Sequence, residues 1–298
     1  MTAQTSAPGL AALFVLAGMM TLGLTDNFLR YVTEDSSLAQ FHFIRGAFAF
    51  AMLAIAAAFG WGIIRPKKPL AVLGRSALVT GAMVIYFGCL SILPIGVVVA
   101  GLFTAPLFVV IITVLIQRQR VGPIRWAAVG VGFAGTLMVI QPDPAALDPV
   151  VFLPVVAGFL YACSAVATRA WCEGEGTLAL TATFFAMLSL TGALGCLLLP
   201  GTGTGAAGFA LRGWMPMTDA NLFWIAVQSV GALIGIACLF RAYQVGEASF
   251  VAVFEYSLLI FASFWAYVLW QESVSLLAGL GMVLIALAGT IIAVRSDG

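Results

Sequence analysis

Residues 94–116 read PIGVVVAGLFTAPLFVVIITVLI and contain no charged side chain. As a helix this stretch rises about 34 Å, enough to cross the hydrocarbon layer of a bilayer, which is about 30 Å thick. Pro106 lies within it and lacks the backbone N–H that would bind the Leu102 carbonyl, so we expect a kink at this point. The stretch predicts a membrane-spanning helix whose freed carbonyl faces protein or a cavity rather than lipid.

Apolar stretches of this kind recur along the whole chain. Of its 298 residues, 62% are hydrophobic and 8% are charged, whereas soluble domains are about 45–50% apolar. The sequence therefore predicts an all-α integral membrane protein in contact with lipid. The ten predicted spans cover residues 9–31, 37–60, 70–90, 94–116, 122–140, 150–172, 177–200, 220–243, 247–270 and 274–295. The first span lacks the basic start of a signal peptide, and we expect it to be retained.

Lys and Arg gather on one side of the predicted bundle. Ten of the 13 basic residues fall on that side, namely Arg65, Lys67, Lys68, Arg75, Arg118, Arg120, Arg125, Arg169, Arg241 and Arg295. Arg30 and Arg212 fall on the other side, and Arg45 lies within a span. Because basic loops stay in the cytoplasm, we expect both termini to be cytoplasmic, in a bacterial inner membrane.

The chain reads as two related halves. Ala134-Gly135-Thr136, at the end of the fifth span, recurs as Ala288-Gly289-Thr290 at the end of the tenth. Five spans per half place the repeats in opposite orientations, a recurrent design of secondary transporters. The predicted organisation is a cytoplasmic tail at 1–8, a first five-helix repeat at 9–140, a linker at 141–149, a second five-helix repeat at 150–295 and a tail at 296–298.

The composition excludes several classes of function. A net charge of +1 offers no basic surface for nucleic acid. One histidine and five cysteines without a close CxxC pair argue against a metal site. Motifs for nucleotide-driven transport or a serine nucleophile are absent, so we expect neither an enzyme nor a resident cofactor. A secondary transporter of a small organic metabolite fits best, and a membrane scaffold or receptor subunit without a transported substrate is the alternative.

Four polar residues on the first two spans are candidates for the substrate site, because a charge at mid-membrane costs about 2.5–3.5 kcal/mol and needs a partner or a function. Asp26 and Asn27 lie near the far end of span one, at the depth of His42 and Arg45 in span two. An Asp26–Arg45 pair is feasible, either as a structural ion pair or as a substrate contact. His42 is either a pH-sensitive group or a simple hydrogen-bonding residue.

The second half contributes Glu255, which has no basic residue in its own span. It is a candidate for recognising a cationic group or coupling transport to protons, with a packing hydrogen bond as the alternative. Aromatic residues on several spans would favour an aromatic, heterocyclic or cationic substrate if they line a cavity, whereas lipid- or core-facing positions are the alternative. These aromatic candidates are Tyr86, Tyr161, Phe254 and Tyr256. Thr104 and Pro106 join the list because of the expected kink.

Small residues at four-residue spacing mark close helix packing in two spans. They are Ala128, Gly132 and Thr136 in span five, with Ala278, Ala286 and Thr290 in span ten. Two interpretations stay open at this point, packing of the two halves against each other and a homodimer interface.

The chain resembles the drug/metabolite transporter superfamily, specifically its ten-helix EamA branch. The resemblance covers most of residues 9–295 and rests on the duplicated five-helix unit and on motifs that are specific in combination. These motifs are Phe43-Ile44-Arg45, Glu255-Tyr256-Ser257-Leu258, Trp270-Gln271-Glu272 and the Gly-Thr endings of spans five and ten. The resemblance implies a central cavity lined by both halves, alternating access, and transport of amino acids, vitamins, nucleoside-like metabolites or organic cations.

Overall fold

The computed structural model describes residues 7–33, 36–90, 92–93, 95–118, 120–142, 149–200 and 208–295. Within these residues ten helices are long and apolar enough to cross a membrane, which confirms the all-α membrane fold. Each corresponds to one predicted span. Pro94, residues 143–148 of the predicted linker, and most of both predicted tails lie outside the described residues.

The first five spans are formed by α1 (Pro8–Asp26) with α2 (Leu29–Thr33), by α3 (Leu38–Ala58), by α4 (Pro69–Cys89), by α5 (Ile95–Leu102) with α6 (Ala105–Leu115), and by α7 (Pro123–Ile140). The other five spans are formed by a 3₁₀ turn (Pro149–Val151) with α8 (Phe152–Ala170), by α9 (Thr177–Leu198), by α11 (Asp219–Val245), by α12 (Ala248–Glu255) with α13 (Ser257–Trp270), and by α14 (Leu276–Arg295). A short helix, α10 (Gly208–Leu211), precedes α11.

Local sequence signals start several of these helices. A capping box opens α3, where the Ser37 side chain accepts from the Gln40 backbone and the Gln40 side chain accepts from the Ser37 backbone. Proline stands in the first turn of α4, α6 and α7, where its missing N–H has no helical partner to lose. Helix ends are therefore fixed by the sequence even though the spans are uniformly apolar.

Three of the ten spans are broken, and only one break was predicted. The kink at Pro106 is confirmed: α5 ends at Leu102 and α6 begins at Ala105. Within this break the Thr104 hydroxyl donates to the Gly101 carbonyl at 2.6 Å. The other breaks, between α1 and α2 and at Tyr256 between α12 and α13, follow no proline.

The break after α1 is explained by Asn27. Its side-chain amide donates to the Gly23 carbonyl at 2.7 Å and to the Ala262 carbonyl of α13 at 3.1 Å. An asparagine side chain that occupies backbone carbonyls competes with continuation of the helix. Gly23 permits this contact, because a Cβ there would lie 2.8 Å from the Ala262 nitrogen.

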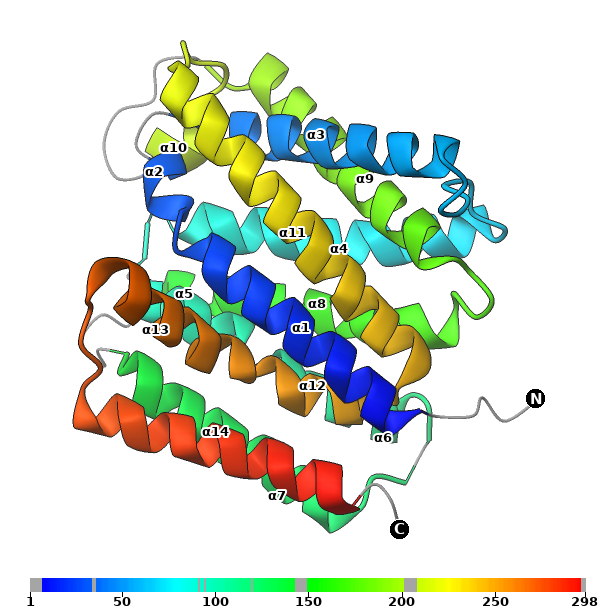
Figure 1. Cartoon of the computed structure of the whole chain (residues 1–298), viewed down its shortest axis with the longest axis vertical. Coiled ribbons are helices and arrows are strands. Elements are labelled where there is room, and N and C mark those ends of the chain that lie inside the picture. Colours follow the sequence, from blue (N-terminus) through cyan, green and yellow to red (C-terminus); the bar gives the residue numbers. More distant parts are fainter. Residues whose placement is uncertain are drawn as a thin grey trace.

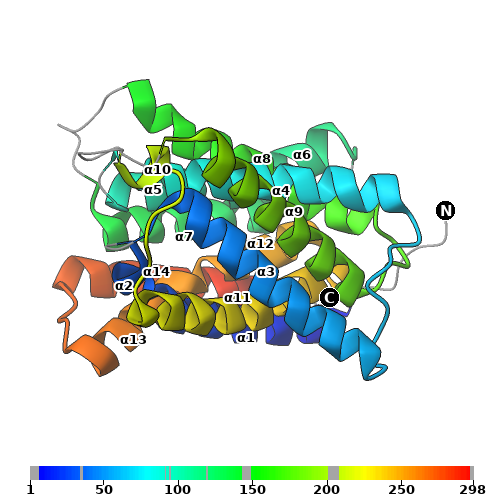
Figure 2. The ribbon, with the colours of Figure 1, turned by 90° about the horizontal axis from the view of Figure 1, so that it is seen from above.

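The two halves of the chain interdigitate. Helix α1 packs against α11, α3 against α9, α4 against α8 and α7 against α14, so each of these pairs joins one half to the other. Figures 1 and 2 show α3 and α9 crossing side by side at one edge of the bundle, while Figure 1 shows α7 and α14 together at the opposite edge. The start of α1 and the end of α14 lie at the same end of the bundle (Figure 1).

The stripe of small residues in α7 faces into the molecule. Ala128, Gly132 and Thr136 are all buried, and the neighbouring Gly135 lies against α14, since a Cβ there would approach the Gly281 carbonyl to 2.6 Å. In span ten Ala278 is buried, whereas Ala286 and Thr290 are exposed. The α7 stripe therefore packs the halves together, and the homodimer interface stays a prediction.

Helices α3 and α9 cross at two glycines. A Cβ on Gly192 would lie 2.3 Å from the Phe43 nitrogen, and a Cβ on Gly46 would lie 2.5 Å from the Phe185 carbonyl oxygen. The backbones can approach this closely only because neither position carries a side chain, as in other tightly packed membrane helices.

We predict that Gly192→Ala destabilises the protein by about 1–3 kcal/mol, because the methyl group overpacks the α3–α9 crossing. Melting of the detergent-purified protein measures the loss. The matched control is Gly130→Ala in α7, where a Cβ meets nothing within 4 Å. This control should be neutral or slightly stabilising, because alanine is the better helix former. Equal melting temperatures for the two variants would contradict the crossing geometry.

Candidate functional site

A cavity of about 320 Å³ lies inside the bundle and is lined by helices of both halves. Its walls come from α1, α3, α4, α5, α6, α8, α9, α11, α12 and α13, together with Asn27 and the start of α2. These elements belong to spans one to four and six to nine. The paired helices α7 and α14 contribute no lining residue among those described.

Seven of the predicted site residues line this cavity. They are Asp26, Asn27, Arg45, Tyr86, Pro106, Tyr161 and Glu255. The structure therefore brings together polar side chains that lie as much as 229 positions apart in the sequence. Most of the remaining wall is apolar, and Met83, Leu239 and Leu258 are representative of it. A concave, mainly apolar chamber with a few convergent polar groups is the usual form of a small-molecule site.

One polar group of the cavity consists of Asp26, Asn27, Arg45 and Tyr86. Asp26 is exposed and lines the cavity at the end of α1. Arg45 is buried, and its guanidinium carbon lies 5.2 Å from the centroid of the Phe41 ring and 5.6 Å from that of Phe87. Cation–π contacts of this kind partly replace the lost hydration of the guanidinium.

The predicted Asp26–Arg45 ion pair is not formed. Within the described residues these side chains do not approach to ion-pair distance, although they interact electrostatically. The Nε and Nη1 atoms of Arg45 have no hydrogen-bond partner. The separation leaves both groups able to contact a molecule in the cavity.

The second polar group centres on Glu255 at the end of α12. Its carboxyl accepts a hydrogen bond from the Tyr243 hydroxyl, and Tyr161 lies beside it. Tyr243 is fully buried on α11 behind the cavity wall, whereas Tyr161 lines the cavity from α8. The two tyrosines fix the orientation of a carboxyl that would otherwise be buried among apolar side chains. Sequence analysis missed Tyr243, because nothing in its local pattern distinguishes it from a core tyrosine.

Four predicted site residues lie outside the cavity. Both nitrogens of the His42 ring are buried without a partner, and the ring packs against Phe41 and Phe87 at 5.4 and 5.3 Å. The Thr104 hydroxyl donates to the Gly101 carbonyl within the helix break, and the side chain lies against Gly158.

Phe254 and Tyr256 point away from the cavity because α12 presents Glu255 to it. Tyr256 is fully buried and stacks on Phe103 at 5.9 Å, and Gly132 of α7 leaves room for its ring. Phe254 packs against Phe250 at 5.0 Å. The α13 contribution to the cavity is aliphatic and includes Leu258 and Leu259. Phe254 and Tyr256 therefore take core positions, the alternative to lining the cavity.

Arg75 was also misplaced by the sequence analysis, which counted it with the loop between spans two and three. It lies within α4 and is 1% exposed, with its guanidinium carbon 3.5 Å from the Phe240 ring centroid. Its Nε donates to the Thr168 hydroxyl at 2.7 Å. Its closeness in sequence to Lys67 and Lys68 concealed this burial.

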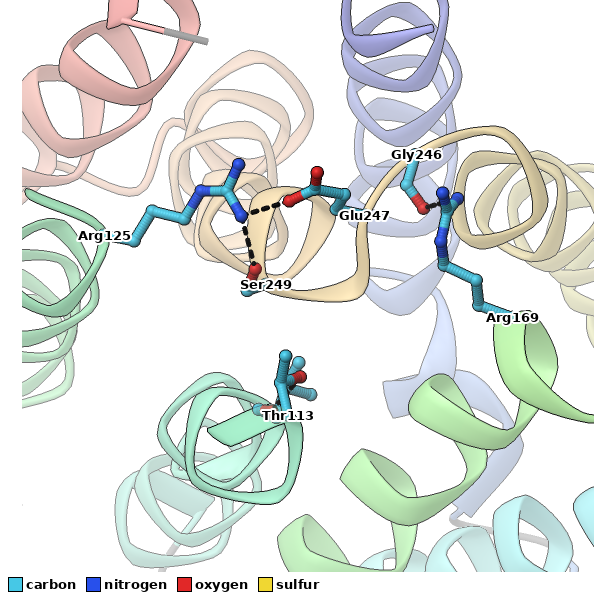
Figure 3. Close-up of polar contacts among 7 residues, drawn as sticks. Thr113, Arg125, Arg169, Gly246, Glu247 and Ser249 are labelled. Carbon is cyan, nitrogen blue, oxygen red and sulfur yellow. Dashed lines mark hydrogen bonds and ion pairs between the residues drawn. The ribbon is translucent and has the colours of Figure 1, made fainter. Parts of the chain in front are cut away.

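Opposite the exposed Asp26, the bundle is held by contacts to the turn between α11 and α12. Arg125 of α7 forms an ion pair with Glu247 and lies 3.1 Å from the Ser249 hydroxyl, to which it donates. Arg169 of α8 donates to the Gly246 carbonyl. Figure 3 shows the two arginines approaching this turn from either side, with Thr113 of α6 beneath. We call Arg125, Arg169 and residues 246–249 the arginine clamp.

A ten-span bundle around a partly charged interior cavity is the architecture of an integral membrane transporter. Residues 9–141 match the EamA-like transporter family, which confirms the predicted resemblance over that part of the chain.

Relatives of the chain are named as transporters of small metabolites. It is 28% identical to a riboflavin transporter of Rhizobium johnstonii, over 81% of this chain and 74% of that protein. It is 22% identical to an S-adenosylmethionine uptake transporter of Rickettsia prowazekii, over 86% of this chain and 83% of that protein. It is 26% identical to a riboflavin transporter of Vibrio cholerae, over 56% of this chain and 51% of that protein. A solved crystal structure shares the fold, with a TM-score of 0.79 at 16% identity over 97% of this chain and 99% of its own.

We predict that Tyr243→Phe destabilises the protein by about 1.5–3 kcal/mol, because it removes a hydrogen bond to a buried carboxyl. A double-mutant cycle with Glu255→Gln, followed by thermal or denaturant unfolding, isolates the coupling between the two residues. Tyr267→Phe is the control, since Tyr267 is exposed on α13. Additive effects of Tyr243→Phe and Glu255→Gln would mean that the two side chains do not stabilise each other.

Proposed function

We propose that the protein is a secondary transporter that takes up a small heterocyclic metabolite, of the class represented by riboflavin and S-adenosylmethionine, across the inner membrane of a bacterium. The names of its relatives support this substrate class. The name of the S-adenosylmethionine uptake transporter also supports the direction of transport. The observation that carries the proposal is the interior cavity, which holds Asp26, Arg45 and Glu255 in one chamber. Its volume of about 320 Å³ lies within the range of ligand pockets, about 300–1,000 Å³.

The two halves are, in this proposal, inverted repeats. Exchanging the halves turns span one into six, two into seven, three into eight, four into nine and five into ten. Under this exchange the α1–α11 pair becomes the α4–α8 pair, while the α3–α9 and α7–α14 pairs map onto themselves. An offset of 153 residues also relates Phe103 to Tyr256, which stack on each other and mark the breaks of spans four and nine. A pseudo-two-fold axis through the bundle accounts for all of these relations.

We propose alternating access between the two ends of the cavity. Asp26 marks one end and is exposed, and with cytoplasmic termini this end would face the periplasm. The arginine clamp lies at the other end of the bundle, and we propose that it closes the cavity there, which would make this conformation outward-open. Because the halves interdigitate, rocking of two rigid halves does not suit this bundle. We propose instead that the broken spans one, four and nine bend at their interruptions, since a broken helix is the usual place for such a change in a transporter.

We predict that Glu255→Gln lowers riboflavin uptake into proteoliposomes by about tenfold or more, or abolishes its response to a proton gradient. Loss of one charge-assisted interaction corresponds to about 1.5–3 kcal/mol, hence tenfold or more in rate. Melting of the variant shows whether the fold is intact. Wild-type uptake of riboflavin or S-adenosylmethionine supports the substrate class.

The matched control is Glu272→Gln, which neutralises a carboxylate at the end of span nine, outside the cavity lining. Uptake by Glu255→Gln equal to that of the wild type would remove Glu255 from the mechanism. Absence of uptake of every heterocycle tested by the wild-type protein would contradict the proposed substrate class.

We predict that Glu247→Gln and Arg125→Gln each accelerate amide hydrogen exchange at residues 245–250 by about two- to fivefold. The clamp side chains are partly exposed, and such ion pairs contribute about 0.2–1 kcal/mol. Hydrogen exchange reads the opening equilibrium of this turn directly. Arg241→Gln is the control, because Arg241 is exposed on α11. Exchange that is unchanged in both clamp variants would show that the ion pair does not hold the turn.

A further inference from the structure

Arg45 is a buried cation whose donors are left unused. It is 3% exposed, and the Phe41 and Phe87 rings hold its guanidinium in place. Two of its three nitrogens have no hydrogen-bond partner in this structure. Buried polar groups are normally paired, and an unpaired donor on a charged group is strongly unfavourable. Both nitrogens are enclosed, so a bound molecule would supply the missing acceptors and remove this penalty if the guanidinium turns toward the cavity that Arg45 lines.

The surroundings of Arg45 favour an acceptor that comes from the cavity. Asp26 is the carboxylate that interacts with it electrostatically, and it stays beyond ion-pair distance. His42 shares the Phe87 ring, and its nitrogens are also without partners. Arg45 lines the cavity, where Asn27 and Tyr86 provide further hydrogen-bonding groups. A guanidinium presents a planar fork of N–H donors that matches a carboxylate or phosphate in two parallel hydrogen bonds.

From this geometry we infer that Arg45 is a specificity-determining residue that binds an anionic group, a carboxylate or a phosphate, on the transported molecule. This inference rests on the proposed function of the cavity and adds to it a charge requirement at one end. The substrate would place its anionic group at Arg45 and extend along the apolar wall toward Glu255. A cationic group on the same molecule would find Asp26 beside this anion site.

The experiment uses two pairs of ligands that differ in one anionic group. Riboflavin is compared with riboflavin 5′-phosphate, and S-adenosylmethionine with its decarboxylated form. Binding to the purified protein is measured by calorimetry for the wild type, Arg45→Gln and Arg45→Lys, with Arg241→Gln as the control. Acetate and inorganic phosphate, at ionic strength matched with chloride, test the anion site by melting without reference to any substrate.

In at least one pair, the anionic member should bind the wild type about tenfold or more tightly than its partner, since a charged hydrogen-bonded pair contributes about 1.5–3 kcal/mol. This preference should vanish in Arg45→Gln and be partly kept in Arg45→Lys, which retains the charge but loses the fork. The member without the anion should bind wild type and Arg45→Gln within about threefold of each other, which also shows that the variant is folded.

Two results would overturn the inference while leaving the transporter proposal intact. One is binding of both members of each pair with equal affinity by the wild type, and the other is a preference for the anion that survives in Arg45→Gln. If no member of either pair binds, the proposed substrate class fails, and the simple anions decide about Arg45. Stabilisation by acetate or phosphate that disappears in Arg45→Gln supports the anion site. If these anions shift the melting temperature of the wild type and of every variant equally, Arg45 serves only as an internal counter-charge to Asp26.

Discussion

The absence of water in the hydrocarbon layer is the constraint on which this structure depends. Every backbone polar group within the membrane must be satisfied inside the protein, so the chain can cross only as helices. The same constraint turns polar side chains inward, where they need a partner or a function. Asp26, Arg45 and Glu255 come from three different spans and face the same chamber for this reason. The cavity is therefore a consequence of the solvent as much as of packing.

Cross-packing of the halves determines what kind of motion this bundle allows. Because α1 packs against α11 and α4 against α8, neither half has a core of its own that would let it move as a rigid body. Glycine contacts at the α3–α9 crossing hold two of the spans at close range. The helix interruptions adjoin Asn27, Thr104 and Glu255, at or beside the cavity wall. In the proposed mechanism the spans bend at these interruptions, next to the proposed binding site.

The sequence predicted the spans well, because hydropathy and length decide the fate of a segment in lipid almost independently of its neighbours. It also predicted the break at Pro106, which is a local covalent effect. The breaks at Asn27 and Tyr256 were not predicted. The break at Asn27 depends on a contact with Ala262 of another helix, which the local sequence does not reveal.

The sequence did not predict which residues surround each buried polar side chain. Seven of eleven candidates line the cavity, among them the charged residues Asp26, Arg45 and Glu255. Arg75 and Tyr243 were missed because their roles depend on Phe240, Thr168 and Glu255, which the chain brings near only after folding. His42 and Tyr256 lie outside the cavity because their rings pack against Phe41, Phe87 and Phe103.

The central claim is that the cavity is a substrate chamber that opens to one side of the membrane at a time. Thiol labelling of a single cysteine at Met83, which lines the cavity, tests it most directly in a variant whose five native cysteines are replaced. We expect labelling from the periplasmic side in right-side-out vesicles, slower labelling when riboflavin is present, and little labelling from the cytoplasmic side without substrate. Equal labelling from both sides, unaffected by riboflavin, would indicate an open pore or an unrelated crevice and would contradict the proposed mechanism.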